Sequence, residues 1–365
     1  PYAPMLSYLA SPWTLMINRE AVEKYGDLTE HAPGTGPFIF KSWEKDVKFE
    51  LDKNPDYWKL GLDGNPLPYV DGITWLISTN PDTVATLFID KKIHAVIVGQ
   101  SNLDRVKKAR GDATYKAVPS QFWKQFRMQP TTADKPYKPP FDDPRVRQAI
   151  VKGIDPRAGL DFVYNGDGIL AHGPILPIYE KWALHETPEG AKYDPAAARA
   201  LLEQAGVDKV SGPLIWASTS TEQDQIAEVL KQQLAQIGVD IELQPKELAA
   251  YYNQTYAYDY TFSHHTPLNN PDPDENLSSY FGRNSTFFKH YNPDIWDMID
   301  AQAAELDEEK RIQIVLDTQQ AIIADYPMKF MWTTNLHEFT DPAVKNWFYH
   351  QDLYDGRVED LYLDA

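Results

Sequence analysis

Apolar and charged residues alternate along residues 47–52 (VKFELD). A period of two places alternate side chains on one face of the chain, so this segment is predicted to be a half-buried strand. Residues 32–37 (APGTGP) are rich in turn formers, and the apolar run 38–40 (FIF) follows them, which indicates the first strand of a hairpin. The apolar run 73–77 (ITWLI) predicts another strand.

The most informative pattern covers residues 214–243. An apolar run at 214–218 is followed by apolar residues at helical spacing that stop at Gly238, and then by alternation over 239–243. A strand, a helix and a strand within about thirty residues form a βαβ unit, which implies parallel pairing and a right-handed crossover. The chain is therefore predicted to be an α/β protein.

Further helices are predicted from capping residues and from periodicity. Three begin near Pro144, Asp194 and Pro293, and a further one runs through Ile312, Val315 and Ile322. The last pattern stops before Pro327, after which residues 330–332 (FMW) are strand-like. Residues 129–140 are polar and proline-rich, so we place a domain boundary near residue 133.

Length and composition bound the class of protein. The chain has 365 residues, of which 42% are hydrophobic and 24% charged, and this fits two domains of ordinary globular composition. Its uncharged apolar stretches are far shorter than a bilayer span. A formal charge of -18 repels phosphate backbones, so nucleic acid is not expected as a partner. Cysteine is absent from the sequence, which excludes thiol catalysis, thiolate metal sites and disulfides.

Motifs for catalysis and metal binding are missing or incomplete. The glycines at 34 and 36 lack a third at Ile39 and precede a predicted strand, so a phosphate loop is not expected. Neither G-x-S-x-G nor H-E-x-x-H occurs. Residues 272–276 (DPDEN) begin like a calcium loop, but Leu277 replaces the required glycine and Arg283 occupies the twelfth position. No metal, cofactor or enzymatic activity is predicted.

His264 and His265 are adjacent. Successive side chains on a strand point to opposite faces, so the two histidines are not expected to bind one metal ion together. Two interpretations stay open. Either one of the two histidines lines a ligand cleft, or both histidines lie at the surface or in the core.

Several short blocks, in order along the chain, resemble one protein family. They are 34–38 (GTGPF), 54–58 (NPDYW), 141–149 (FDDPRVRQA), 154–157 (IDPR), 193–195 (YDP), 234–241 (LAQIGVDI) and 270–273 (NPDP). Each block is weak alone, but the ordered set spans nearly the whole chain. The sequence resembles the peptide/nickel-binding family of extracytoplasmic solute-binding proteins of bacterial ABC importers.

The resemblance implies a two-lobed fold of the periplasmic-binding-protein type, with mixed sheets flanked by helices and a hinge between the lobes. Residues 1–132 and 329–365 would form one lobe and residues 133–328 the other. The lobes would close on a small-molecule ligand and then dock on the transmembrane permease subunits. The protein would act as a monomer, in the periplasm or lipid-anchored outside the cytoplasmic membrane, and would leave its ligand chemically unchanged.

The N-terminal end departs from the family pattern. Complete members carry a long segment before the GTGP signature, whereas only 33 residues precede Gly34. We therefore expect a partial chain, and the loss of the missing strands would expose sheet edge and apolar surface.

Position 269 bears on the ligand. Peptide-binding members often have an aspartate there that pairs with the peptide amino group, whereas this chain has Asn269, an amide that cannot supply the charge. Aromatic residues make up 13% of the chain, with 10 Trp and 21 Tyr, and flat rings suit stacking on sugar faces. An oligopeptide and an oligosaccharide are therefore both candidate ligands.

Residues at predicted strand ends and at the passages of the chain between the lobes are candidate ligand contacts. They are Trp123, Trp216, His264, His265, Asn269 and Trp332. Core packing is the alternative for each tryptophan. Three other functions stay open: a carbohydrate-active hydrolase, a nickel- or haem-binding relative, and a signalling or chaperone-like protein that shares the fold.

Overall fold

The computed structural model describes residues 1–10, 14–28, 31, 33–268, 272–348 and 358–364. The chain divides into two compact units. Unit 1 comprises Pro1–Tyr8 and Pro119–Thr334, and unit 2 comprises Leu9–Val118 and Asn335–Ala365. The chain passes between the units at residues 118–119 and 334–335, whereas the predicted boundaries lie near 133 and 329. Pro1–Tyr8 belongs to unit 1. The assignment of residues to lobes stays a prediction.

The largest sheet has seven strands, six of which follow the order β4 (Ala95–Val98)–β10–β5–β9–β7–β8. Their bounds are β5 (Thr114–Met128), β7 (Val210–Ala217), β8 (Val239–Lys246), β9 (Phe262–His265) and β10 (Met328–Thr340). Strand β7 is parallel to β8 and β9, whereas β9 is antiparallel to β5. A short strand, β6 (Gly168–Leu170), pairs with β10. This mixed sheet confirms the predicted α/β class and the predicted parallel pairing across residues 214–243.

Several helices of unit 1 begin with a capping side chain followed by proline. They are α5 (Pro144–Lys152), α6 (Pro156–Tyr164), α7 (Pro195–Gln204), α10 (Pro273–Phe281) and α11 (Pro293–Ala304). In each, an aspartate or asparagine oxygen accepts a backbone N–H of the first turn, and the proline occupies a position that has no intrahelical donor to lose. The predicted helix starts near residues 144, 194 and 293 are thus confirmed. They could be predicted because the capping residue and the proline are local signals.

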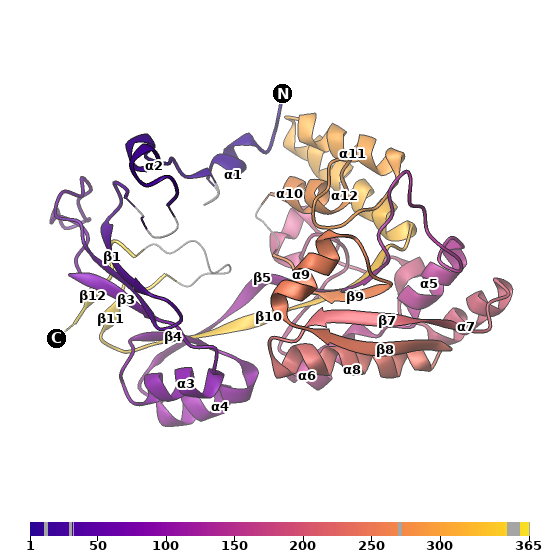
Figure 1. Cartoon of the computed structure of the whole chain (residues 1–365), viewed down its shortest axis with the longest axis horizontal. Helices are drawn as coiled ribbons and strands as arrows, with labels where there is room; N and C mark the ends of the chain where they lie inside the picture. Colours follow the sequence, from indigo (N-terminus) through magenta and orange to yellow (C-terminus); the bar gives the residue numbers. More distant parts are fainter. Residues whose placement is uncertain (11–13, 29–30, 32, 269–271, 349–357, 365) are drawn as a thin grey trace. The chain divides into compact units, whose positions relative to one another are not determined.

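Helices lie on both faces of the sheet. Figure 1 shows α6 and α8 (Thr221–Ala235) on one side of β7 and β8, and α9 (Leu248–Tyr256) on the other. The remaining long helix, α12 (Glu308–Ala324), packs with α11. A continuous apolar core fills the space between these layers and includes Trp123, Trp216 and Trp332.

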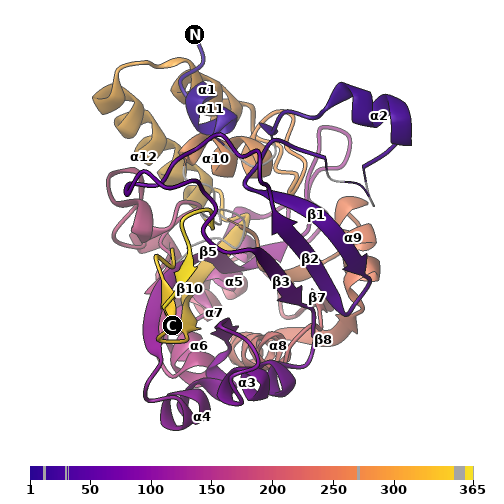
Figure 2. The same ribbon diagram turned by 90° about the vertical axis from the view of Figure 1, so that its left-hand side faces the viewer.

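Unit 2 contains a three-stranded antiparallel sheet of β1 (Phe38–Glu44), β2 (Lys48–Lys53) and β3 (Gly72–Leu76), visible side by side in Figure 2. The pairing confirms the predicted hairpin and the third strand. Elsewhere in the unit, α3 (Pro81–Ile89), β4 and α4 (Gln100–Ala109) surround a small core with Phe88 and Phe339, and β4 pairs antiparallel with β10. Shorter elements complete the unit: α2 (Arg19–Tyr25), β11 (Val344–Lys345) and β12 (Tyr362–Leu363).

Candidate functional site

The carboxyl ends of β7 and β9 lie together because these strands are parallel neighbours. Helix α8 begins four residues after the end of β7, so its first turn lies at the same edge of the sheet. In open α/β sheets, this edge is where ligands usually bind. Three of the sequence-predicted contacts, Trp216, His264 and His265, belong to it.

A polar cluster lies at this edge and consists of Lys124, Gln223, His264 and Thr266, called here the β9 polar cluster. His264 lies opposite Phe126 in the β5–β9 register, which places Thr266 opposite Lys124 and on the same face. Lys124 Nζ donates to Thr266 Oγ1 at 3.1 Å, and Gln223 Nε2 donates to the same oxygen at 3.2 Å. Gln223 Oε1 lies 2.6 Å from His264 Nε2.

The imidazole of His264 is only 1% exposed. Burial, together with the nearby charge of Lys124, lowers the pKa of His264 from 6.5 to about 3, so the ring is neutral near pH 7. A neutral ring has one N–H, and Gln223 Oε1 can only accept. We therefore assign the proton to Nε2; Nδ1 is then an acceptor, so its 3.4 Å contact with the Gln125 carbonyl is not a hydrogen bond.

Lys124 is the buried charge of the cluster, with 7% of its surface exposed. Burial lowers the pKa of Lys124 from 10.5 to about 8, and the charge of Glu222 opposes this shift. The ammonium therefore stays mostly protonated near pH 7. Gln223 and Thr266 are half-buried, so the cluster reaches the surface of unit 1 through these two side chains.

Trp216 is buried in the apolar core, and its Nε1 donates to Asp224 Oδ1 at 2.7 Å. Because Leu214 pairs with Phe262 in the β7–β9 register, Trp216 falls on the same face of the sheet as His264. The structure thus brings Trp216 and His264 to one edge, covered by α8.

His265 lies on the opposite face of β9. Its Nδ1 is 2.7 Å from the Tyr251 hydroxyl on α9, whereas His264 contacts α8. The prediction that the adjacent histidines point to opposite faces is confirmed. Within the described parts of the chain, no group of three or more His, Asp and Glu side chains could hold a metal ion.

Trp123 and Trp332 are not brought into hydrogen-bonding contact with the cluster. Trp123 stacks on Phe330 with ring centroids 5.4 Å apart, and Trp332 packs so closely on Gly159 that a Cβ there would lie 2.8 Å from its ring. Both indole N–H groups lack a hydrogen-bond partner among the described residues. Asn269 lies outside the described residues. The roles of all six residues as ligand contacts stay predictions.

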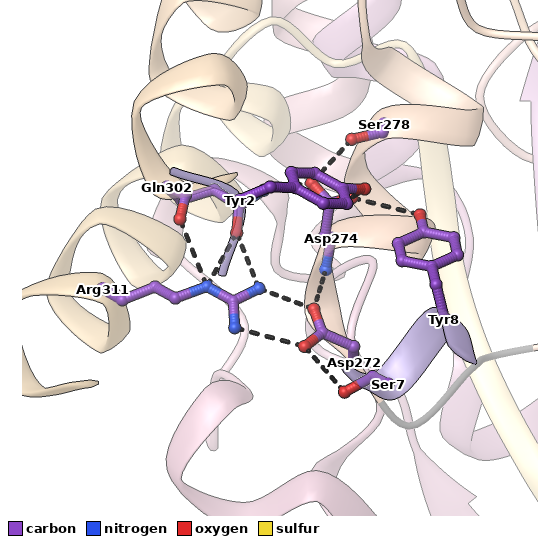
Figure 3. A network of polar contacts seen from close by, with 8 residues as sticks. All are labelled: Tyr2, Ser7, Tyr8, Asp272, Asp274, Ser278, Gln302 and Arg311. Atoms are coloured by element: carbon purple, nitrogen blue, oxygen red, sulfur yellow. Dashed lines mark hydrogen bonds and ion pairs between the residues drawn. The ribbon is translucent and has the colours of Figure 1, made fainter. Parts of the chain in front are cut away.

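A second polar network lies at the start of α10 (Figure 3). Asp274 is buried, and its carboxylate accepts from the hydroxyls of Tyr2 at 3.0 Å, Tyr8 at 3.1 Å and Ser278 at 2.8 Å, and from the amide of Gln302. This network fastens residues 1–8 to the helices of unit 1.

Asp272 belongs to the same network. It forms a bidentate ion pair with Arg311, with distances of 2.6 and 3.2 Å, and its side chain also caps α10 through the Asp274 N–H. The two aspartates that resembled the start of a calcium loop are therefore occupied by protein donors.

Comparison with known proteins gives the family. The model of the middle part of bacterial extracellular solute-binding proteins, family 5, matches residues 1–288. The chain belongs to this family. A glutathione-binding protein of Salmonella typhimurium is 31% identical over 251 residues, which are 66% of this chain and 44% of that protein. Its counterpart in Pectobacterium atrosepticum is 30% identical over 245 residues, or 67% of this chain and 45% of that protein.

Solved structures of binding proteins confirm the fold. The oligopeptide-binding protein AppA of Bacillus subtilis, solved with a nonapeptide, superposes with a TM-score of 0.82 at 18% identity, covering 100% of this chain and 75% of its own. DppA of Helicobacter pylori, solved with the peptide STSA, gives 0.82 at 22% identity, covering 100% and 71%. The resemblance seen in the sequence is thus confirmed. No described helix is long and apolar enough to cross a membrane.

Sequence reasoning missed Lys124, Gln223 and Thr266. The available signal was a lysine inside the aromatic stretch 121–126 (QFWKQF). A charged residue is unusual inside a buried strand. Its partner Thr266 could not be found in the same way, because it depends on the pairing of β5 with β9, which joins residues 142 positions apart in the sequence.

The depressed pKa of His264 predicts how stability depends on pH. The unfolded histidine titrates near 6.5 and the folded one near 3, so the contribution of His264 is complete above pH 6.5 and is lost as the pH falls towards 3. The loss has a limiting slope of about 1.4 kcal/mol per pH unit. Denaturant unfolding of the wild type and of His264→Gln between pH 4 and 7 measures it. Parallel curves for the two proteins would contradict the buried neutral imidazole.

Proposed function

We propose that this chain is part of the substrate-binding component of an ABC importer, which captures a small solute and delivers it to a membrane permease. The observation that carries the proposal is the family 5 match over residues 1–288. The aligned curated relatives are named glutathione-binding proteins, and two similar structures were solved with bound peptides. These names favour an oligopeptide over an oligosaccharide as the solute.

The mechanism follows from this assignment. The two units are the lobes, and a hinge at the passages of the chain between them lets the lobes close on the solute. The carboxyl edge of β7 and β9 supplies contacts on unit 1, where the β9 polar cluster offers fixed hydrogen-bonding groups. The protein works outside the cytoplasmic membrane as a monomer, and the ligand leaves chemically unchanged.

Binding and turnover measurements on the full-length protein test the proposal. We expect native mass spectrometry to show one non-covalent solute, and calorimetry to show binding of glutathione or a short peptide such as trialanine. Neutral maltooligosaccharides, incubated in parallel, test the sugar alternative. Recovery of cleaved peptide or cleaved sugar would instead establish an enzyme, and absence of binding across the whole panel would refute the proposed solute class.

A further inference from the structure

Three side chains of the β9 polar cluster, Lys124, Gln223 and Thr266, have hydrogen-bond donors left over. Thr266 Oγ1 accepts from both Lys124 and Gln223, which uses its two lone pairs and leaves its own O–H as a donor. Gln223 Oε1 is occupied by His264, and one amide N–H of Gln223 stays available. Lys124 has two further N–H groups beyond the one given to Thr266.

Lys124 also has an unbalanced charge. No carboxylate among the described residues lies within 4.0 Å of its ammonium; Glu222 acts on it only from a longer distance. A buried ammonium without a counter-ion is costly, and the cost falls when an anion is placed against it.

We propose that the β9 polar cluster binds a carboxylate of the transported solute, with Lys124 as the counter-ion and the Thr266 hydroxyl and Gln223 amide as neighbouring donors. A carboxylate has only acceptors when ionised, so it matches the free donors of Lys124, Gln223 and Thr266. A neutral sugar hydroxyl could accept one of these hydrogen bonds but would leave the charge of Lys124 unbalanced. The inference rests on the proposed function and narrows its solute class to acids.

Lys329 offers a matched control on unit 1. It is also a buried lysine whose pKa is lowered by burial, to about 7, but its ammonium donates to the backbone carbonyl of Ala191 and lies outside the cluster. Replacing either lysine by methionine removes one buried charge and keeps most of the side-chain volume. Only the Lys124 variant should change the preference for an acid.

The experiment compares acids with their neutral derivatives in the full-length protein. Calorimetry is run with trialanine and trialanine amide, and with glutathione and its diethyl ester, on the wild type, Lys124→Met and Lys329→Met. We expect the wild type and Lys329→Met to bind each acid at least tenfold more tightly than its derivative, a difference of about 1.4 kcal/mol. In Lys124→Met this preference is expected to disappear.

The outcomes separate this inference from the proposed function. If peptides bind but the acid preference is absent from the wild type, or persists in Lys124→Met, the carboxylate site is wrong and the solute-binding function stands. If no solute binds, the proposed function fails, and thermal unfolding without ligand decides the inference: removing an ammonium that has no counter-ion should raise the melting temperature. A fall in the melting temperature of Lys124→Met would show that the protein itself satisfies Lys124, and would overturn the proposal.

Discussion

Replacing Arg147 by methionine is expected to lower the free energy of unfolding by about 3–5 kcal/mol, because it leaves a paired carboxylate and several carbonyls without their cation. Arg147 is 5% exposed. Its guanidinium lies 2.8 Å from Asp325 Oδ1, donates to the carbonyls of Asp325 and Phe141, and covers the ring of Tyr137. The side chain thus joins α5 to the end of α12.

Asp325 shows why this pair depends on pH. Burial by itself would raise the pKa of Asp325, but a hydrogen bond from His290, another from Asn292 and the charge of Arg147 hold it well below its usual value. A carboxylate with a depressed pKa contributes stability that is complete above the unfolded pKa and is lost as the pH falls through the folded one. The difference between the wild type and Arg147→Met should therefore shrink in strong acid.

Arg145 provides the control on the same helix. It is half-exposed and pairs with Asp143, so Arg145→Met is expected to cost no more than about 1 kcal/mol. Urea unfolding monitored by tryptophan fluorescence measures both variants. Equal losses for the two arginines would contradict the structural role given to Arg147.

Replacing Asp274 by alanine is expected to destabilise the protein by at least about 2 kcal/mol and to free residues 1–8 from unit 1. The carboxylate is 1% exposed and accepts hydrogen bonds from Tyr2, Tyr8, Ser278 and Gln302 (Figure 3). Without it, donors on three segments lose this shared acceptor, and the amide of Gln302 is buried. Limited proteolysis followed by mass spectrometry measures the release of the first residues, and urea unfolding measures the stability.

Glu275→Gln is the matched control, because Glu275 follows Asp274 in the same first turn of α10 without taking part in these hydrogen bonds.

Alkaline pH is an independent test of the same contacts. Burial and the charge of Asp274 raise the pKa of Tyr2 from 10.0 to about 12, so this contribution is complete below pH 10 and is lost as the pH rises towards 12. Unchanged protection of residues 1–8 in Asp274→Ala would refute the anchoring role.

Individual helices and strands could be predicted because periodicity, capping residues and turn residues lie within the element itself. The segment 210–246 shows strand, helix and strand periodicities, and the structure has β7, α8 and β8 there. The starts of α5, α7 and α11 follow from a capping aspartate or asparagine and a proline. The β1–β2 hairpin follows from alternation after a turn.

The site was harder to predict, and the tryptophans show why. A surplus of aromatic residues suggested a ligand cleft, but Trp123, Trp216 and Trp332 are each buried in the core of unit 1. A tryptophan buries a large apolar area in either setting, so its identity does not distinguish a core from a cleft. The position of a tryptophan along the chain did not separate the two settings either, because residues near strand ends also pack into the core.

The family, the α/β class, the βαβ unit and the opposite facing of His264 and His265 could all be predicted from the sequence, because they depend on residue order, on periodicity or on the alternation of one strand. Which side chains meet depends on how the chain folds. The register of β5 with β9 brings Lys124 to Thr266, and the packing of residues 1–8 brings Tyr8 to Asp274. Such contacts join segments 142 and 266 residues apart, where the geometry comes from the folded sheet and helices and no local pattern of residues specifies it.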